Sequence, residues 1–505
     1  MNTRLVRLVL QPFGKTVEVP GGTPLQEVLF AHGVEFPCGG KGRCRGCRVK
    51  VLAGDLPLTP PQQERLSPAE QAAGWRMACQ GLAADGLVLE LAQWEASILT
   101  DHSQFEFTPR PGLGVAVDLG TTTLVAQLLD LPTASVLAVA TALNSQAQFG
   151  ADIMSRVQYA LTPEGRDRLR QMIRHQLGSM IQDLLAGSGR SGSPVDAVVL
   201  AGNTVMHHLF CGLDPEPLSR YPFEPTELDR QVFTDSALGW SLGGQTSVQF
   251  LPCLGGFVGS DILAGILACG QAQSSDLTVL LDLGTNGEVV VGNRDRLFCA
   301  STAAGPAFEG ARISMGMRAA TGAISEVTVA GGAYQCKVLG QSEPRGLCGS
   351  GLVDAVAAGL ELGDILPSGR LAKKMEPIRL TPPVCVTQAD IRELQLAKGA
   401  IAAGIRMLLD QWGAKSSDVA RVYLAGAFGN YINRHSARRI GLFDFSPDQV
   451  EPSGNTALLG AKMALFPRHP ENGDYHDLRR RVSHLSLSAD PQFQDIYAEA
   501  MGFDS

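Results

Sequence analysis

Four cysteines gather near the N-terminus of this 505-residue chain at a spacing that suits a metal centre. Cys38, Cys44 and Cys47 lie in the segment PCGGKGRCRGC, separated by five and by two residues, and Cys79 lies 31 residues further on. Thiolates are the ligands of iron–sulfur clusters and of structural zinc. The neighbouring glycines let the backbone fold around the sulfur atoms and donate N–H bonds to them. We therefore expect one metal centre here rather than a disulfide framework.

The spacing of these cysteines favours an iron–sulfur cluster over zinc. Three thiolates on one tight loop with a distant fourth is the ligand pattern of [2Fe–2S] ferredoxins, and the spacing of five and two residues is similar to that of vertebrate and bacterial members. Structural zinc is the alternative, but zinc ribbons usually bring their ligands as two close pairs, whereas Cys79 has no near partner.

Basic residues surround the cysteine loop on a chain whose formal net charge is −8. They are Lys41, Arg43, Arg45, Arg48 and Lys50. No acidic residue lies between Cys38 and Gly54. Such a patch can steer an acidic electron-transfer partner, or it can be a solvated loop that offsets the negative charge of a cluster. The residues leave both interpretations open.

A second constellation is an Asp-Leu-Gly-Thr turn that occurs twice, in LGVAVDLGTTTLVAQLLD (113–130) and LTVLLDLGTNGEVVVGN (277–293). Each copy places a carboxylate, Asp118 or Asp282, at the end of an apolar strand. The residues that follow offer hydroxyl groups and backbone N–H donors: Gly120, Thr121, Thr122 and Thr123 in the first copy, and Gly284, Thr285, Asn286 and Gly287 in the second. Together they predict a phosphate site with hydrated Mg²⁺. The alternative is a pair of ordinary tight hairpins.

The elements that must position these residues divide the chain into a small and a large unit. Residues 1–97 carry alternating strand patterns and one short helix, which predicts a mixed α+β domain, and the polar stretch 98–111 is expected to be a linker. Residues 112–466 contain the repeat and predict a duplicated α/β domain with a cleft, half I spanning about 112–275 and half II about 276–466. Residues 467–505 predict a polar tail, solvated or partly ordered.

Composition excludes some classes of protein. Lys and Arg total 42 against 50 Asp and Glu, so no overall basic field is available for nucleic acid or an anionic membrane surface. Neither a secretory signal nor a run of 18 apolar residues is found, so we expect a cytoplasmic protein that does not span a membrane.

The two turns and the later segment LAGAFGN resemble the phosphate-1, phosphate-2 and adenosine motifs of the actin, hexokinase and heat-shock ATPase superfamily. The resemblance implies that Gly426, Ala427, Phe428 and Gly429 pass close to an adenosine. It also implies that a helix opened by a Thr387–Asp390 capping box holds adenine and ribose through Gln395 and Lys398. In a connecting helix of the first half, Gln148 or Asp152 would position water. Glu288 would be another candidate base.

Adjacent histidines at positions 207 and 208 could be read as metal ligands. On an apolar helix such a pair is more often one packed and one solvent-facing histidine, so we expect that arrangement.

A ferredoxin domain placed ahead of such an ATPase resembles the reductive activators of corrinoid proteins. The likeness rests on PCGGKGRCRGC, RMACQ, DLGTTT, LAGNTVMHHL, DLGTNGE, AAGPAFEGA, LCGSGLVD and YLAGAFGN. It implies a β-grasp ferredoxin domain followed by an actin-like ATPase domain, with a [2Fe–2S] cluster, ATP and Mg²⁺ as cofactors. It further implies one-electron reduction of a Co(II) corrinoid to Co(I), a corrinoid methyl-transfer protein as partner, and a homodimer formed through the ATPase domain. A low-potential ferredoxin or flavoprotein would supply the electron.

Two other classes of function stay open on the sequence. A small-molecule kinase with an accessory ferredoxin would need a second substrate pocket beside the γ-phosphate. An electron carrier or redox sensor with a degenerate ATPase domain would bind no nucleotide.

Overall fold

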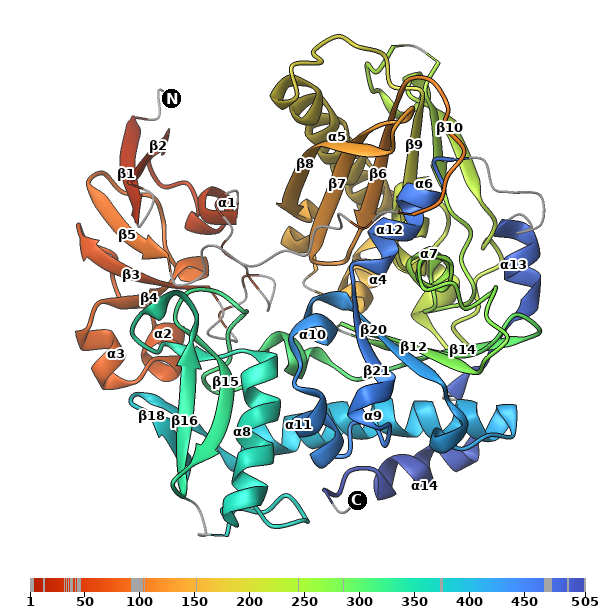
Figure 1. Ribbon diagram of the computed structural model, residues 1–505. Helices are drawn as coiled ribbons and strands as arrows, with labels where there is room; N and C mark the ends of the chain where they lie inside the picture. The colour runs from red at the N-terminus through yellow and green to blue at the C-terminus, as the bar shows by residue number, and fades with distance from the viewer. Residues whose placement is uncertain are drawn as a thin grey trace.

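The computed structural model describes residues 4–11, 14–30, 32, 34, 36, 40, 42, 47–91, 103, 105–150, 152–243, 245–284, 286–372, 376–466, 475–487 and 490–503. Figure 1 shows a small N-terminal domain on the left, beside a larger body whose two halves lie one above the other. In this described part, no helix is both long enough and apolar enough to cross a membrane.

The N-terminal domain is a five-stranded sheet. Its strands are β1 (Leu5–Gln11), β2 (Lys15–Pro20), β3 (Arg48–Ala53), β4 (Trp75–Met77) and β5 (Leu87–Leu91), in the order β2–β1–β5–β3–β4. Alternate residues of β1 pack against helix α1 (Leu25–Phe30), because a strand turns every second side chain to the same face. This confirms the α+β ferredoxin domain. Strand β4 and the helices α2 (Pro60–Arg65) and α3 (Pro68–Ala72) were not predicted, because so few residues show no periodicity.

Half I of the larger body is built on a six-stranded sheet in the order β10–β11–β9–β6–β7–β8. The strands are β6 (Leu113–Leu119), β7 (Thr123–Asp130), β8 (Ser135–Leu143), β9 (Ala197–Ala201), β10 (Gln231–Thr234) and β11 (Ser247–Phe250). Strand β6 is buried on both faces. Val115 and Val117 face helices α5 (Pro163–Gly187) and α6 (Thr204–Cys211), whereas Ala116 faces α7 (Ser260–Ala268). Burial on both faces explains its continuous apolar sequence.

Half II repeats this arrangement. Its sheet has the order β21–β20–β12–β13–β14–β22. The strands are β12 (Thr278–Leu283), β13 (Gly287–Gly292), β14 (Leu297–Thr302), β20 (Arg421–Ala425), β21 (Val450–Gly454) and β22 (Val482–His484). In each half an antiparallel meander, β6–β7–β8 or β12–β13–β14, is followed by strands added in parallel to its first strand. This confirms the duplicated actin-like fold.

Two helices occupy the space between the sheets. Helix α7 and helix α12 (Thr456–Met463) share one hydrophobic core with Ala116 of β6 and Leu280 of β12. They cross closely, since a Cβ added to Gly460 would lie 2.2 Å from the carbonyl oxygen of Ala264. The two helices therefore connect half I and half II through their packing.

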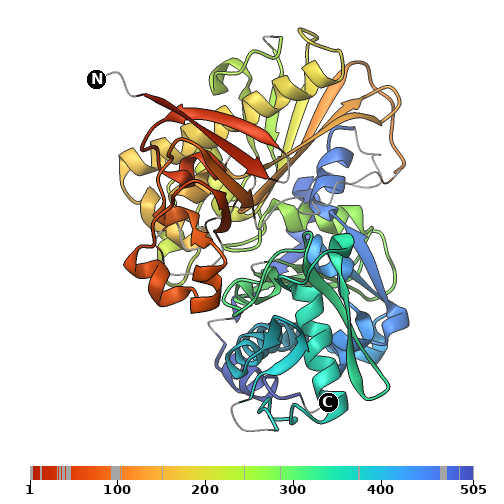
Figure 2. The ribbon, with the colours of Figure 1, turned by 90° about the vertical axis from the view of Figure 1, so that its left-hand side faces the viewer.

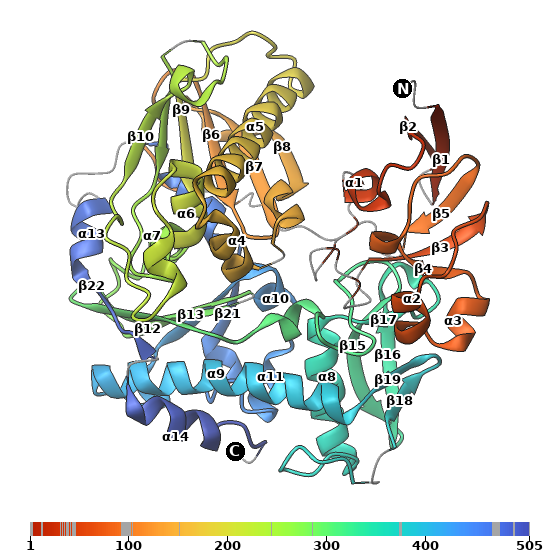
Figure 3. The same cartoon turned by 180° about the vertical axis from the view of Figure 1, so that it is seen from behind.

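A long helix, α9 (Gln388–Trp412), covers the outer face of the half II sheet, and α8 (Gly349–Leu362) packs against strand β15 (Ala323–Ala330). Helix α9 begins with the predicted capping box, in which Thr387 and Asp390 exchange hydrogen bonds. Figure 3 shows α9 running beneath the sheet, with helix α14 (Pro491–Glu499) on its far side.

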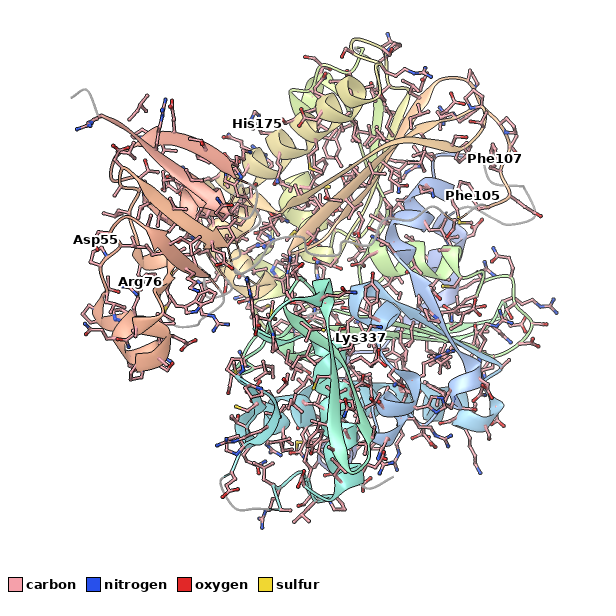
Figure 4. All side chains as sticks on the ribbon, turned by 60° about the vertical axis from the view of Figure 1, so that its left-hand side comes forward. Asp55, Arg76, Phe105, Phe107, His175 and Lys337 are labelled. Carbon is pink, nitrogen blue, oxygen red and sulfur yellow. The ribbon has the colours of Figure 1, made fainter. Side chains whose placement is uncertain are left out.

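The N-terminal domain contacts half II through an ion pair. Arg345 donates to Glu90 of β5, and it lies beside a small sheet of β15 (Ala323–Ala330), β16 (Ala333–Val338) and β17 (Gly346–Leu347). In Figure 2 this small sheet lies below the N-terminal domain, while half I rises behind the same domain. Figure 4 marks the two sides with Asp55 and Arg76 on the domain and Lys337 on β16.

Two expectations about connecting segments need correction. Residues of the expected linker pack against the ATPase domain, because the rings of Phe105 and Phe107 lie 5.6 Å and 4.9 Å from that of Phe466. Figure 4 places both labelled rings on the half I side, far from the labelled N-terminal residues and from His175 of α5. The described part of the linker thus packs on the ATPase domain through apolar contacts, which its mainly polar composition did not predict.

The expected polar tail is part of half II. Strand β22 pairs in parallel with β14, α14 packs on α9, and Leu478, Leu487 and Phe503 are buried. Helix α13 (Tyr475–Arg481) leads into this strand. Because these few apolar residues are spread among many charged ones, nothing in the sequence indicated that they are buried.

Candidate functional site

Two of the four predicted cluster ligands lie in the described residues, and the fold brings their chain segments together. Cys47 directly precedes β3 and is 1% exposed, and its carbonyl oxygen accepts a bond from the backbone N–H of Ala78, next to Cys79. The side-chain Nε2 of Gln80 donates to the Sγ atom of Cys79 at 3.6 Å. Donors aimed at sulfur stabilise a thiolate, so this pair fits a thiolate-bound cluster. Cys38 and Cys44 lie outside the described residues.

Of the five basic residues around the cysteine loop, Arg48 and Lys50 lie in the described residues. Lys41, Arg43 and Arg45 lie outside the described residues. The Arg48 guanidinium forms a 3.0 Å ion pair with Glu70 and lies 5.9 Å from the ring centre of Trp75. Its charge is therefore partly neutralised within the domain, which weakens the case for Arg48 as a steering residue.

The repeated turns lie at matching places in the two halves. Asp118 and Asp282 occupy the penultimate positions of β6 and β12, where they pair in parallel with Ala201 and Ala425. In the first turn the N–H of Gly120 donates to the carbonyl oxygen of Thr123 at 3.1 Å. In the second turn the N–H of Gly284 likewise donates to the carbonyl oxygen of Asn286 at 3.0 Å. Thr285 lies outside the described residues.

Four carboxyl groups form one electrostatically interacting set: Asp118, Asp261, Asp282 and Glu288. Burial raises the pKa of Asp282 to about 7, and the charge of Asp118 adds to this shift. Burial also raises the pKa of Asp118 to about 6, although a hydrogen bond from Asn455 opposes the rise. The two phosphate-turn carboxyl groups are thus close enough to repel each other when both are ionised.

The other two members of the group come from different elements. Burial and the charge of Asp282 raise the pKa of Asp261, in the first turn of α7, to about 7. Burial and the charges of Asp261 and Asp282 raise the pKa of Glu288 well above its usual value. The Ser301 hydroxyl donates to this carboxyl group at 3.1 Å. A bound cation would relieve the mutual repulsion of all four groups.

These carboxyl groups interact electrostatically without forming a compact metal-binding cluster in the described residues. Among the described residues no three His, Cys, Asp or Glu side chains converge closely enough to hold one metal ion directly. Mg²⁺ usually keeps several water ligands and takes one or two carboxylates plus substrate phosphates, so the spacing fits a hydrated ion held jointly with a nucleotide.

Three polar residues of this site were missed by the sequence reasoning: Asp261, Asn203 and Asn455. The Nδ2 atom of Asn203 donates to Oγ1 of Thr121 at 2.8 Å, and Nδ2 of Asn455 donates to Oδ2 of Asp118 at 2.8 Å. Both asparagines also cap a helix, α6 and α12 respectively. The repeated Gly-Asn-Thr at 202–204 and 454–456 was the signal that could have found them.

The predicted adenosine segment lies beside the second turn. Helix α10 (Gly426–Tyr431) follows β20 directly, and Gly426 has a φ of +81°, which a residue with a side chain rarely adopts. A Cβ there would also lie 2.8 Å from Oδ1 of Asp282. Phe428 stacks on Phe308 at 4.4 Å, and Gly429 lies in the same helix, whereas the side chain of Ala427 is outside the described residues.

Gln395 and Lys398 do not face this site, which corrects the expectation that they hold adenine and ribose. Both are buried, with 3% and 2% exposure, under the C-terminal segment. Nε2 of Gln395 donates to the carbonyl oxygen of Met501 at 2.8 Å, and the Lys398 ammonium donates to that of Gly502. That ammonium also lies 5.3 Å from the ring centre of Phe503. The sequence showed a polar helix face but not the segment that covers it.

Gln148 and Asp152 lie on the wall of a large cavity between the domains. Both Asp152 carboxylate oxygens accept bonds from Ser155, at 2.8 Å each, so this side chain caps helix α4 (Ile153–Ala160). The structure thus gives Asp152 a capping role, and it places Asp261 rather than Asp152 among the interacting carboxyl groups.

The cavity has a volume of about 1580 Å³ and joins three parts of the molecule. Phe30, Phe36 and Arg48 contribute from the ferredoxin domain, and Thr122 and Asn286 contribute from the two phosphate turns. Residues near the cysteine loop and residues of both turns therefore border the same space.

The two adjacent histidines are both buried, which corrects the expectation that one faces solvent. His207 is 0% and His208 is 1% exposed. Burial, with His208 as the next cause, lowers the pKa of His207 to about 3. Nδ1 of His208 lies 2.8 Å from the carbonyl oxygen of Thr204 within the same helix. The pair therefore belongs to the core of half I.

Comparison with known proteins agrees with this architecture. A family model described as "2Fe-2S iron-sulfur cluster binding domain" matches residues 8–84, one described as "RACo middle region" matches 113–274, and one described as "C-terminal domain of RACo the ASKHA domain" matches 276–505. The chain thus has an iron–sulfur domain of the [2Fe–2S] type and an ATPase domain of the actin-like type.

Relatives that match about three quarters of this chain, and one solved structure that matches nearly all of it, carry related names. "Corrinoid activation enzyme RamQ" from Eubacterium limosum is 35% identical over 433 residues, which are 79% of this chain and 72% of that protein. "[Co(II) methylated amine-specific corrinoid protein] reductase" from Methanosarcina barkeri is 26% identical over 422 residues, 76% of each chain. The solved structure "Reductive activator for corrinoid,iron-sulfur protein" is similar with a TM-score of 0.68 and 27% identity, covering 98% of each chain.

Proposed function

Since this chain belongs to the family of reductive activators of corrinoid proteins, we propose that it couples ATP binding and hydrolysis to a one-electron reduction. The [2Fe–2S] cluster that the ferredoxin domain would hold would supply the electron, and the acceptor would be an inactive Co(II) corrinoid on a partner protein, which is reduced to Co(I). The observation that carries the proposal is the cavity that borders both the cluster domain and the two phosphate turns.

The ferredoxin domain supplies the electron. Cys38, Cys44, Cys47 and Cys79 would hold the [2Fe–2S] cluster, which when bound stores and releases one electron. Gln80 stabilises the thiolate form of Cys79 through its bond to sulfur. A low-potential ferredoxin or flavoprotein would return the electron to the cluster after each transfer.

The ATPase domain supplies the energy. Backbone N–H groups and hydroxyls of residues 120–123 and 284–287 would bind the phosphates, while Asp118 and Asp282 would hold hydrated Mg²⁺. Gly426, Ala427, Phe428 and Gly429 would flank the adenosine. Asp261, whose pKa is about 7, is suited to accept a proton from the attacking water, and Glu288 is the second candidate.

The energetic requirement is of a size that ATP can meet. A deficit of roughly 0.2 to 0.3 V for one electron equals about 5 to 7 kcal/mol by the relation ΔG = −nFΔE. Closing of the two halves on nucleotide changes the affinity for one corrinoid state relative to the other, and it shifts the equilibrium only by that difference in binding energy.

The partners follow from the same proposal. The acceptor is a corrinoid-binding methyl-transfer protein, and the activator works as a homodimer joined through the ATPase domain in the cytoplasm. Sedimentation of the purified holoprotein at micromolar concentration tests the dimer.

The decisive experiment separates cluster chemistry from ATP coupling. Asp282→Asn removes one phosphate-turn charge, so the cluster should remain reducible by titanium(III) while ATP-dependent formation of Co(I) is lost. The readout is the decay of the Co(II) absorbance and the growth of the Co(I) band on a supplied corrinoid protein, with and without ATP. Equal conversion in both conditions by the wild type, or a full ATP response in Asp282→Asn, would overturn the proposal.

A further inference from the structure

The side chain and backbone of one residue, Asn144, hold both ends of the phosphate-1 turn. Its Nδ2 atom donates to the carbonyl oxygen of Gly120 at 2.9 Å, and its backbone N–H donates to that of Thr122 at 2.8 Å. Asn144 is 0% exposed, and Nδ2 also reaches the sulfur of Met206 at 3.5 Å. A change in the shape of the turn must therefore move Asn144 or break these bonds.

Asn144 also starts the segment that forms one wall of the interdomain cavity. Its Oδ1 atom accepts a bond of 3.0 Å from the N–H of Gln146 and so caps the short 3-10 turn Ser145–Gln148. Gln148, Phe149 and Gly150 then line the cavity, which Phe36 of the ferredoxin domain also lines. Only a few residues thus separate the phosphate turn from the surface next to the cluster domain.

This segment is hydrogen-bonded to helix α5 of half I. Nε2 of Gln146 donates to the carbonyl oxygen of Leu169 at 3.0 Å, and Oε1 of Gln176 accepts from the N–H of Ser145 at 2.9 Å. Both partners belong to α5, which makes the turn, Asn144 and α5 one hydrogen-bonded unit. Further along, the buried Arg156 donates to Gly150 at 2.8 Å and to the Met206 sulfur at 3.6 Å.

We propose that Asn144 is a positioning residue that transmits nucleotide binding from the phosphate-1 turn to the cavity wall facing the ferredoxin domain. The inference rests on the proposed function, because it needs a nucleotide at this turn. It goes further by naming the residue through which the ATP site reaches the space beside the cluster. Coupling of this kind requires a contact that both sites bias, and Asn144 supplies one.

A second asparagine provides the matched control. Asn203 contacts the same turn, since its Nδ2 atom donates to Oγ1 of Thr121 at 2.8 Å. It caps α6 rather than the cavity segment, through a 3.0 Å bond from the N–H of Met206 to its Oδ1 atom. A change at Asn203 therefore perturbs the phosphate turn without cutting the link to residues 145–150.

Hydrogen exchange of the full-length holoprotein, with Mg²⁺ and the non-hydrolysable analogue AMPPNP, tests the proposal without a corrinoid partner. In the wild type, nucleotide should slow exchange about tenfold in peptides covering 117–128 and in those covering 144–152. Asn144→Asp keeps the side-chain acceptor for Gln146 but loses the donor to Gly120. It should retain the protection of 117–128 and lose that of 144–152, whereas Asn203→Ser should keep the two regions linked.

The outcomes separate this inference from the proposed function. The role of Asn144 is overturned if wild type binds AMPPNP with no change in hydrogen exchange at 144–152. It is also overturned if exchange there slows in Asn144→Asp as it does in wild type. Both outcomes leave nucleotide binding intact. Wild type that shows no AMPPNP binding by calorimetric titration overturns the proposed function and this inference with it. Should Asn144→Asp not fold, Asn144→Ser replaces it, and failure of both to fold would assign Asn144 to stability alone and overturn the proposal.

Discussion

The side-chain amide of Asn455 donates a 2.8 Å hydrogen bond to Oδ2 of Asp118, across 337 residues of chain. Asn455 follows β21 of half II and caps α12, whereas Asp118 is the penultimate residue of β6, the first strand of half I. One contact therefore joins the end of the half II sheet to the phosphate-1 carboxylate. It also holds the pKa of Asp118 lower than burial alone would set it.

Removing this contact should affect catalysis beyond its effect on stability. Asn455→Ala loses a helix cap, at a cost of about 1 kcal/mol, and it also raises the pKa of Asp118 above about 6. The acid limb of the ATPase pH profile should move to higher pH. At a fixed pH on that limb, the ATPase rate should fall about tenfold for each unit by which the pKa of Asp118 rises. Asn433→Ala is the control, because Asn433 caps helix α11 (Arg434–Arg439) through bonds to His435 and Ser436. If both variants give the wild-type pH profile, the contact has no catalytic role.

The raised pKa values predict how stability depends on pH in the absence of Mg²⁺ and nucleotide. Asp261 titrates near 3.8 when unfolded and about 7 when folded, so between these values the folded state binds more protons and stability falls as pH rises. Asp261→Asn removes this loss. The difference in melting temperature between Asp261→Asn and wild type should therefore become more favourable to the variant from pH 4 to pH 8. The expected change is about 2 to 4 °C for each kcal/mol of unfolding free energy that wild type loses over this range.

Calorimetry in matched buffers measures this difference. The exposed Asp295→Asn serves as control and should keep a constant offset from wild type across the range. A constant offset for Asp261→Asn as well would show that its carboxyl group does not titrate between these pH values.

The thiol pair predicts which cysteine substitutions abolish the cluster. Cys47→Ser should reduce the iron content from about two per chain to near zero, since a [2Fe–2S] centre needs four thiolates. Cys211→Ser, in α6, should leave iron and sulfide unchanged. Iron and sulfide assays on anaerobically purified protein, with the EPR spectrum after reduction, give the readout. One zinc per wild-type chain and no visible absorbance would contradict the cluster assignment.

The C-terminal segment predicts a structural role for Lys398. Lys398→Met removes a hydrogen bond to Gly502 and a cation–π contact with Phe503, so the melting temperature should fall while the Kd for ATP changes by less than about twofold. Thermal unfolding and an ATP titration measure the two effects separately. A loss of ATP affinity of about tenfold or more would restore the prediction that this helix face contacts adenosine.

Local patterns in the sequence were sufficient for several of the elements and for the duplication. Alternation in β1, the Thr387–Asp390 capping box and the repeated Asp-Leu-Gly-Thr turn each depend on neighbouring residues, so they can be read from a short stretch of chain. Parallel pairing then places the ends of β6 and β12 at matching edges of their sheets. The carboxyl groups of Asp118 and Asp282 could therefore be chosen as site residues before their surroundings were known.

Only the tertiary structure could decide what covers each polar group. Gln395 and Lys398 show the same polar spacing on α9 whether they face a nucleotide or Met501 and Gly502, because the covering segment comes from about a hundred positions away. For the same reason nothing in the sequence indicated that Asp261, in the first turn of the apolar helix α7, interacts with Asp118 and Asp282, because these carboxyl groups come from distant parts of the chain. Spacing along the chain determines which side chains lie on one face of a helix or strand. Whether those side chains are buried, and which charges they interact with, depends on the distant elements that pack against that face.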